Sequence, residues 1–181
     1  MDHIFLMLET TDLSVKTAKL KRVSALRTNK KGQQLCSFEK VIEVDGDKES
    51  VRTLMTGLEN IMLQNNLGGK YVVISYFGQD FYRPMLEKYC KIANMKMPFT
   101  RAWIGLEQLA WPYAFDGKLR NRSIGALGEL LEIKETEPLW LLYQCYWTLM
   151  RRLTTGVLME DQARSHAGPL FEMGQKFLRQ F

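Results

Sequence analysis

The segment IFLMLETTDL, residues 4–13, indicates the fold more clearly than any other stretch of this sequence. Its first half, residues 4–8, is an unbroken apolar run, which is typical of a strand buried on both faces in the middle of a sheet. The run stops at Glu9 and is followed by Thr10, Thr11 and Asp12. The sequence therefore predicts a central strand that carries polar side chains at its carboxyl end.

Strand and helix patterns follow this segment in an order typical of an α/β domain. Residues 20–28 read as a second strand, residues 29–32 as a turn, and residues 36–44 as a third strand of an antiparallel meander. Apolar residues at helical spacing then cover residues 51–62. A second buried run at 71–76 leads through Gly78 and Asp80 into a helix with apolar residues from 85 to 92, as in a parallel strand–helix unit.

The second half is mostly helical in pattern. We expect a short strand at 102–106, a helix ending at Trp111 and Pro112, a basic loop at 113–121 and helices at 123–131 and 138–153. A joint at 154–156 precedes a last amphipathic helix that Gly168 and Pro169 open. The prediction is a mixed five-stranded sheet flanked by helices in residues 1–153, with a helical C-terminal extension in residues 154–181.

Composition restricts the function only loosely. The 181 residues fit one compact domain, and the net charge of +5 permits contact with nucleic acid without being diagnostic of it. The three cysteines, Cys36, Cys90 and Cys145, form no CxxC pair and predict reduced thiols. No apolar run is long enough for a signal peptide or a membrane span, so we expect a cytoplasmic protein without membrane contact.

Four segments in this order resemble the DEDD (DnaQ-like) 3′–5′ exonucleases of the ribonuclease H-like fold. Glu9, Thr10, Thr11 and Leu13 match the family's D-x-E-T-T/G-G-L motif, and residues 23–26 and 38–42 look like its second and third strands. The segment YVVISYFGQDFYRPMLE, residues 71–87, resembles the second motif through Phe81, Arg83, Pro84 and Leu86, and residues 122–133 are similar to the helix before the third motif. The resemblance implies a ribonuclease H-like fold.

The departures from the family are at its metal ligands. In these exonucleases four carboxylates hold two metal ions, one of which generates hydroxide. At the corresponding positions this chain has Met7, Tyr82 and Tyr143, while only Glu9 retains its carboxylate; Pro138 stands at the third-motif histidine. One carboxylate cannot neutralise two divalent ions, and the residues therefore favour a non-enzymatic, exonuclease-like module without a cofactor.

An active, divergent exonuclease acting on single-stranded DNA or RNA is the alternative. It would need Mg²⁺ or Mn²⁺ held by Glu9 together with relocated acids, of which Asp12 and Asp80 are the nearest in sequence and Asp116 and Asp161 are more distant. We expect Asp80 to be a helix N-cap instead. His3 and His166 are far apart in sequence and near no cysteine pair, which argues against a zinc site or a histidine-dependent nucleophile.

An inactive module would act by binding, and the sequence leaves two kinds of partner open. A nucleic-acid strand would be held in the family's cleft, for which the candidate residues are Thr10, Thr11, Tyr82, Arg83, Lys118, Arg120, Arg122 and Tyr143. The tyrosines are equally well explained as filling the space that metals vacated. A protein partner would dock on the extension, where the apolar residues are Leu170, Phe171, Phe177, Leu178 and Phe181; alternatively this seam packs on the parent domain. The sequence also leaves a homodimer open, without an assigned interface.

Overall fold

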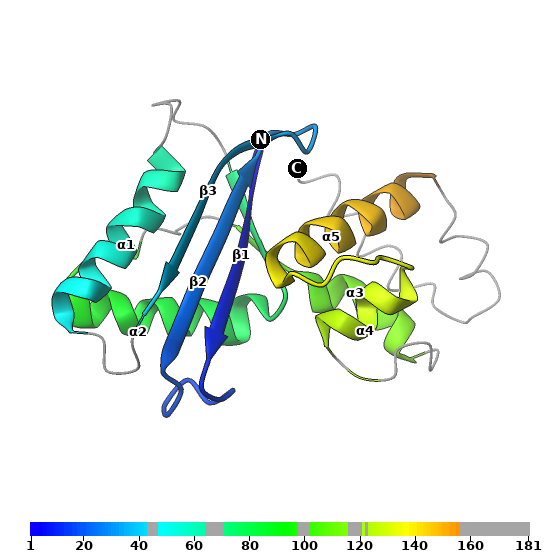
Figure 1. Cartoon of the computed structure of the whole chain (residues 1–181). Coiled ribbons are helices and arrows are strands. Elements are labelled where there is room, and N and C mark those ends of the chain that lie inside the picture. Colours follow the sequence, from blue (N-terminus) through cyan, green and yellow to red (C-terminus); the bar gives the residue numbers. More distant parts are fainter. Residues whose placement is uncertain (43–46, 64–70, 98–101, 116–120, 122, 156–181) are drawn as a thin grey trace. The chain divides into compact units, whose positions relative to one another are not determined.

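The fold is taken from a computed structural model that describes residues 1–42, 47–63, 71–97, 102–115, 121 and 123–155 (Figure 1). The chain divides into two compact units, Met1–Gly105 and Leu106–Phe181. The boundary predicted at residues 153 and 154 falls inside the last described helix, which spans Pro138–Thr155. Residues 156–181, which hold the predicted extension, lie outside the described residues.

The first unit contains a mixed five-stranded sheet, as the sequence predicted. Its strands are β1 (Asp2–Thr10), β2 (Leu20–Thr28), β3 (Gln34–Val41), β4 (Tyr71–Ser75) and β5 (Trp103–Gly105), in the spatial order β3-β2-β1-β4-β5. β1, β2 and β3 form an antiparallel meander, and β4 and β5 run parallel to β1. The carboxyl ends of β1 and β4 therefore lie toward the same edge of the sheet, with Phe5 opposite Ile74.

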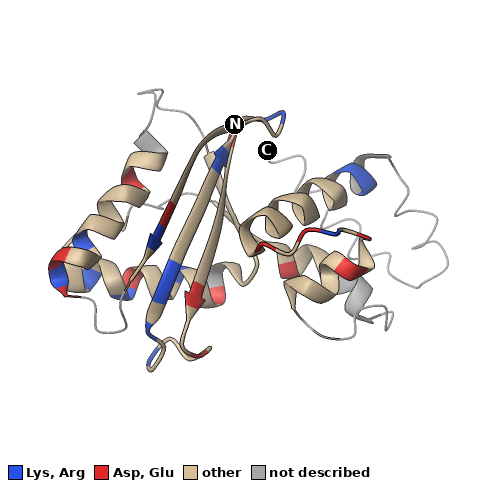
Figure 2. Ribbon diagram, viewed as in Figure 1, with Lys and Arg blue, Asp and Glu red and all other residues tan. Residues whose placement is uncertain are grey.

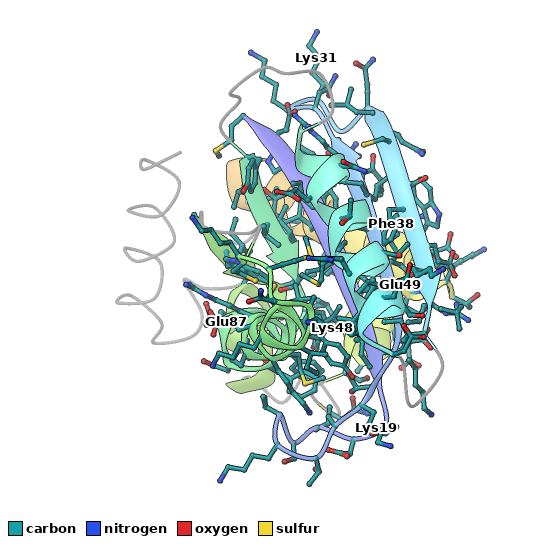
Figure 3. All side chains as sticks on the ribbon, turned by 90° about the vertical axis from the view of Figure 1, so that its left-hand side faces the viewer. Lys19, Lys31, Phe38, Lys48, Glu49 and Glu87 are labelled. Atoms are coloured by element: carbon teal, nitrogen blue, oxygen red, sulfur yellow. The ribbon has the colours of Figure 1, made fainter. Side chains whose placement is uncertain are left out.

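Two helices, α1 (Lys48–Leu63) and α2 (Arg83–Ala93), pack on the same face of this sheet (Figure 1). Strand residues of alternating position, such as Ile4, Leu6 and Leu8, join the apolar residues of both helices in one buried cluster. Neighbouring strands place Ala25 and Phe38 in register with Leu6. Phe38 lies against Gly57 of α1, where an added Cβ would overlap its ring (Figure 3).

A buried arginine ties the end of α1 to the start of β1. The guanidinium of Arg27 donates to the Asp2 carboxylate, at 2.9 Å from Nε and 2.6 Å from Nη2, and its Nη1 donates to the carbonyl oxygen of Ile61 at 3.0 Å. A cation at the last turn of a helix also interacts favourably with the helix dipole. Arg27 thus fixes the amino end of β1 against α1.

The second unit contains α3 (Leu106–Phe115), α4 (Ile124–Leu130) and α5 (Pro138–Thr155). Ser123 is the N-cap of α4, because its Oγ accepts from the Ala126 amide at 3.1 Å. Glu132, just beyond α4, has a left-handed φ of 59°, and the Ile133 amide donates back to the Gly128 carbonyl. A Schellman-type turn therefore ends α4.

Three local predictions were wrong. β3 ends at Val41 rather than Val44, α3 continues through Pro112 to Phe115, and Asp80 is no N-cap. Asp80 lies inside a π-helical turn, η1 (Gly78–Tyr82), and the side chains of the N-cap residues of η1 and α2, Phe77 and Tyr82, form no capping bond. Among the described helices, none is long and apolar enough to cross a membrane.

Candidate functional site

At the carboxyl end of β1, the Glu9 side chain lies on the sheet face opposite α1 and α2, because the preceding Leu8 packs on the helix side. The Glu9 carboxylate lies 3.6 Å from Nε of Arg22, its direct neighbour on β2, and Arg22 also lies 3.4 Å from Glu39 on β3. The Glu9 side chain is 46% exposed and that of Arg22 41%. The charges thus form a row across three strands at the surface of the sheet (Figure 2). Such exposed pairs contribute little to stability, so Glu9 is accessible and weakly held.

Asp12 is occupied within the loop that follows β1. Its Oδ1 accepts from the Ser14 amide at 2.8 Å and from the Thr17 hydroxyl at 3.0 Å, and its carbonyl accepts from the Thr10 hydroxyl at 2.7 Å. The Thr11 hydroxyl donates to Oδ2 at 3.4 Å and accepts from the Lys19 amide. This is an Asx-type turn in which the carboxylate replaces missing backbone partners. Asp12 therefore organises the loop.

Helix α2 holds the same loop from the other side. The Lys88 ammonium donates to the carbonyls of Val15, Lys16 and Ala18, at 3.2, 3.4 and 2.8 Å, which uses all three of its donors. The Leu20 amide donates to the Tyr89 hydroxyl at 2.7 Å. The second half of the loop, Val15 to Leu20, is thus fixed to α2, while Leu13 at its tip is 73% exposed. No local pattern signals these contacts, since they join segments about 70 residues apart.

The second polar segment begins where β4 ends. β1 extends beyond the last residue of β4, and the turn η1 follows β4 through Tyr76 and Phe77. Gly78 permits a close approach here: its φ is 21°, and an added Cβ would lie 2.9 Å from the Cα of Gly105 on β5. The last residue of η1, Tyr82, packs against Phe77 and Phe81, with ring centroids 6.4 and 6.0 Å apart. An aromatic cluster therefore surrounds Tyr82.

Met7 and Tyr82 meet in the space between β1 and η1. The Tyr82 hydroxyl donates to Sδ of Met7 at 3.7 Å, and the tyrosine is only 3% exposed. Burial raises the pKa of Tyr82 to about 12; the nearby Glu9 carboxylate also raises it, and a backbone hydrogen bond with Leu8 opposes the shift. The phenol is therefore neutral over the whole physiological pH range.

These two side chains do not fit a pair of divalent cations. Mg²⁺ and Mn²⁺ prefer oxygen anions, whereas a thioether is a soft ligand and a buried phenol keeps its proton. Within the described part of the chain, no group of three or more His, Cys, Asp or Glu side chains is placed to hold a metal ion. Glu9 is thus the one carboxylate at this strand end among the positions that the family resemblance singles out, and its partner is Arg22.

The structure brings some of the predicted binding residues together in the first unit, and one of the others, Tyr143, belongs to the second unit. Thr10, Thr11 and Tyr82 flank the end of β1, and Arg83 follows Tyr82 in the chain, where its Nε lies 3.1 Å from Glu87. The ring of Tyr82 is buried, so it offers no stacking surface in this conformation. Tyr143 lies on α5 in the second unit, half-buried, in contact with Trp140 and Trp147.

The other predicted binding residues lie outside the described residues. They are Lys118, Arg120 and Arg122 of the basic loop and Leu170, Phe171, Phe177, Leu178 and Phe181 of the extension. Arg22 was not singled out for this site by sequence, although its position opposite the end of β1 follows from the meander. The described cysteines Cys36, Cys90 and Cys145 are free thiols, and burial raises the pKa of Cys90 to about 11 and that of Cys145 to about 12.

Comparison with solved structures defines the class of fold. The element order and sheet topology are those of a ribonuclease H-like fold, as the sequence predicted. The chain is similar to solved structures of exonuclease I. A complex of that enzyme with the SSB C-terminus superimposes with a TM-score of 0.64 at 9% identity, over 85% of this chain and 43% of the enzyme.

Two further exonuclease I structures give the same result. A product-bound form has a TM-score of 0.63 over 85% of this chain and 46% of that one, and the E. coli enzyme with a 5cy-dA13 oligonucleotide has 0.62 over 85% and 43%, both at 9% identity. This chain thus spans less than half of the enzyme, and identity this low establishes the fold alone. No family model and no curated protein matches the sequence.

Proposed function

We propose that this chain is a catalytically inactive exonuclease-like module that binds single-stranded nucleic acid without a metal ion. The observation that carries the proposal is the contact between Met7 and Tyr82, 3.7 Å from sulfur to hydroxyl. An apolar thioether and a neutral phenol fill the positions at which the family resemblance expects anionic ligands. Without those ligands, the activation of water by a bound metal loses its support.

The state of the neighbouring acids supports the same conclusion. The alternative, an active divergent exonuclease, needs Asp12 or Asp80 to join Glu9. The Asp12 carboxylate is engaged by Ser14 and Thr17 inside its loop, and Asp80 is an exposed residue of η1 with no carboxylate cluster around it among the described residues. Recruiting Asp12 to a metal would therefore disrupt the turn that shapes the loop.

Binding is supported by the arrangement of groups around the end of β1. Lys16 and Lys19 are exposed on the loop that adjoins this strand end, and Arg83 lies half-buried at the start of α2. Cationic side chains of this kind contact phosphates in nucleic-acid complexes, whereas the Thr10 and Thr11 hydroxyls donate within the loop. Solved exonuclease I structures include one with an oligonucleotide. The basic residues Lys118, Arg120 and Arg122 belong to this proposal through the sequence resemblance.

A nuclease assay tests inactivity. Purified chain incubated with single-stranded DNA or RNA and either Mg²⁺ or Mn²⁺ is expected to release no nucleotides, and the Glu9→Ala variant is expected to be identical. Metal-dependent release that Glu9→Ala abolishes would establish the alternative. Calorimetry with Mn²⁺ gives an independent readout, for which we expect no binding isotherm.

Fluorescence anisotropy with labelled single strands tests binding. We expect affinity to fall steeply with salt, and the double variant Arg120→Ala, Arg122→Ala to weaken it and to reduce the slope of log K against log salt by about 1.4 if each arginine contacts one phosphate. The matched control is Lys48→Ala, Arg52→Ala on α1, which removes two exposed cations that are not among the candidate binding residues. Salt-independent association that is lost on Phe171→Asp or Phe177→Asp would instead indicate a protein partner.

We place the module in the cytoplasm, which its three free thiols support.

A further inference from the structure

The outer edge of β3 is the longest open backbone edge of the described sheet. β3 is the terminal strand in the order β3-β2-β1-β4-β5, and at eight residues it is much longer than β5 at the other edge. It contains neither proline nor glycine, and six of its eight residues are exposed. An edge of this kind has unpaired amide and carbonyl groups that can accept another strand.

The protective features usually found on edge strands are weak here. The strand carries one acid, Glu39, and one base, Lys40, so it has no net charge, in contrast to +5 for the whole chain. Leu35 is skipped in the pairing with β2, where Arg27 faces Cys36 and Thr28 faces Gln34, and this bulge leaves residues 36–41 as the regular part of the edge. Leu35 and Val41, at the two ends, are 46% and 61% exposed.

The side chains of β3 select a self-complementary register. In an antiparallel pair of identical strands related by a two-fold axis, residues equally distant from the central residue stand opposite each other. Centring the axis on Glu39 or on Lys40 places like charges opposite each other, which is destabilising. Centring it on Phe38 places Glu39 opposite Ser37, Lys40 opposite Cys36, and Val41 beside Leu35.

Phe38 is suited to the central position. It is half-buried and held against Gly57 of α1, so its ring is already ordered before pairing (Figure 3). In this register the two Phe38 rings approach across the axis on the helix-covered face, and directly opposed residues of an antiparallel pair have Cβ atoms about 5 Å apart. The exposed apolar ends, Val41 and Leu35, come together on either side of the axis.

We propose that a second copy of this chain pairs with β3 in this antiparallel register, so that two five-stranded sheets join into one continuous sheet. The pairing satisfies the open backbone groups and covers both exposed apolar side chains of the strand. It uses neither the end of β1 nor its loop, and it is therefore independent of the proposed function.

Sedimentation velocity over a range of concentrations tests the pairing on the full 181-residue chain. We expect a reversible dimer of twice the 21.1 kDa chain mass. Ser37→Glu places a glutamate opposite Glu39 twice per dimer and should weaken association about tenfold, whereas Ser37→Lys creates two opposite-charge pairs and should strengthen it about threefold. The same two substitutions at Thr136, an exposed residue of the second unit, are the controls and should change nothing.

Cysteine cross-linking tests the register itself. The Lys40→Cys substitution places a thiol opposite the native Cys36 of the second copy, and this variant should form an interchain disulfide under a mild oxidant. The Val41→Cys substitution lies on the other sheet face and should cross-link no more than the unmodified chain. A monomer at all concentrations, or a dimer that responds to neither Ser37 variant and forms no interchain disulfide in the Lys40→Cys variant, would overturn the proposal.

Discussion

The two ends of β1 each carry an acid that forms an ion pair with an arginine of β2, and the two pairs differ in distance, burial and further partners. At the amino end, Arg27 and Asp2 are 2.6 Å apart with side-chain exposures of 5% and 25%. At the carboxyl end, Arg22 and Glu9 are 3.6 Å apart and are 41% and 46% exposed. Arg27 also binds the Ile61 carbonyl of α1, whereas Arg22 is shared with Glu39 at the surface.

The difference shows that the same kind of residue pair has different roles at the two ends. A buried, hydrogen-bonded pair cannot lose one partner without leaving the other uncompensated. An exposed pair exchanges readily with water and salt. The ion pair at the amino end of β1 therefore stabilises the fold, and the carboxyl end keeps Glu9 accessible beside the contact between Met7 and Tyr82.

The largest effect is expected from Arg27→Ala. It removes the bonds to Asp2 and Ile61 and leaves both acceptors poorly solvated, so the free energy of unfolding should fall by about 3 kcal/mol. Urea denaturation measures it. Arg27→Lys keeps the charge without the forked geometry, so its free energy of unfolding should lie between those of the unmodified chain and Arg27→Ala. A loss below about 1 kcal/mol would mean that the two ends of β1 do not differ in this way.

Carboxylates introduced at the carboxyl end of β1 should lower the free energy of unfolding by less, and a bound metal ion should offset that loss. Met7→Asp with Tyr82→Asp places two acids beside Glu9 in a partly apolar space, and we expect a loss of about 2 kcal/mol at neutral pH. Mn²⁺ should raise the Tm of this variant by ligand linkage. The control Met7→Asn with Tyr82→Asn should show no change in Tm with Mn²⁺. An equal rise in Tm for both variants would argue against assigning positions 7 and 82 to the family's metal ligands.

Tyr82→Phe should change stability mainly in alkaline solution. The pKa of Tyr82 is raised to about 12 in the folded chain, against 10.0 for an exposed tyrosine. Because the folded state holds the proton more tightly, this contribution to stability is fully present below about pH 10 and is lost as the pH rises toward 12. Between pH 10 and 12, the free energy of unfolding of the variant should therefore fall less than that of the unmodified chain. Chemical denaturation at each pH measures this. The matched control is Tyr146→Phe, because burial also raises the pKa of Tyr146 to about 12.

The smallest effect is expected from Arg22→Ala. Its two ion pairs are exposed, so unfolding free energy should change by less than about 1 kcal/mol, and less again in high salt. Chemical denaturation at low and high salt checks both statements. A loss comparable to that of Arg27→Ala would show that the row from Glu9 to Glu39 is structural.

The strands were predictable from sequence because their patterns are local. β2 was placed at residues 20–28 by its apolar content and the turn at residues 29–32, and the two-face apolar runs identified β1 and β4 as central strands. The ends of elements were harder. Pro112 argues locally for a helix end, yet α3 continues past it, and Asp80 has the composition of an N-cap but lies within a π-helical turn.

The candidate site was predictable in its residue types and not in its contacts. The positions of Met7, Glu9 and Tyr82 came from the family resemblance, but the pairing of Met7 with Tyr82 depends on how far β1 extends past β4, which no local pattern encodes. The use of Asp12 by Ser14 and Thr17 depends on loop conformation. The three carbonyls that bind Lys88 come from a segment about 70 residues earlier.

The contact between Gly57 and Phe38 has a consequence for how this sequence can change over time. Because any side chain at position 57 would overlap the phenylalanine ring, a larger residue there is tolerated only if position 38 becomes smaller. The two positions are expected to vary together among related sequences, large with small. If β3 pairs through Phe38, that covariation would extend to the assembly, since one substitution in α1 would then alter the centre of an interface on another strand.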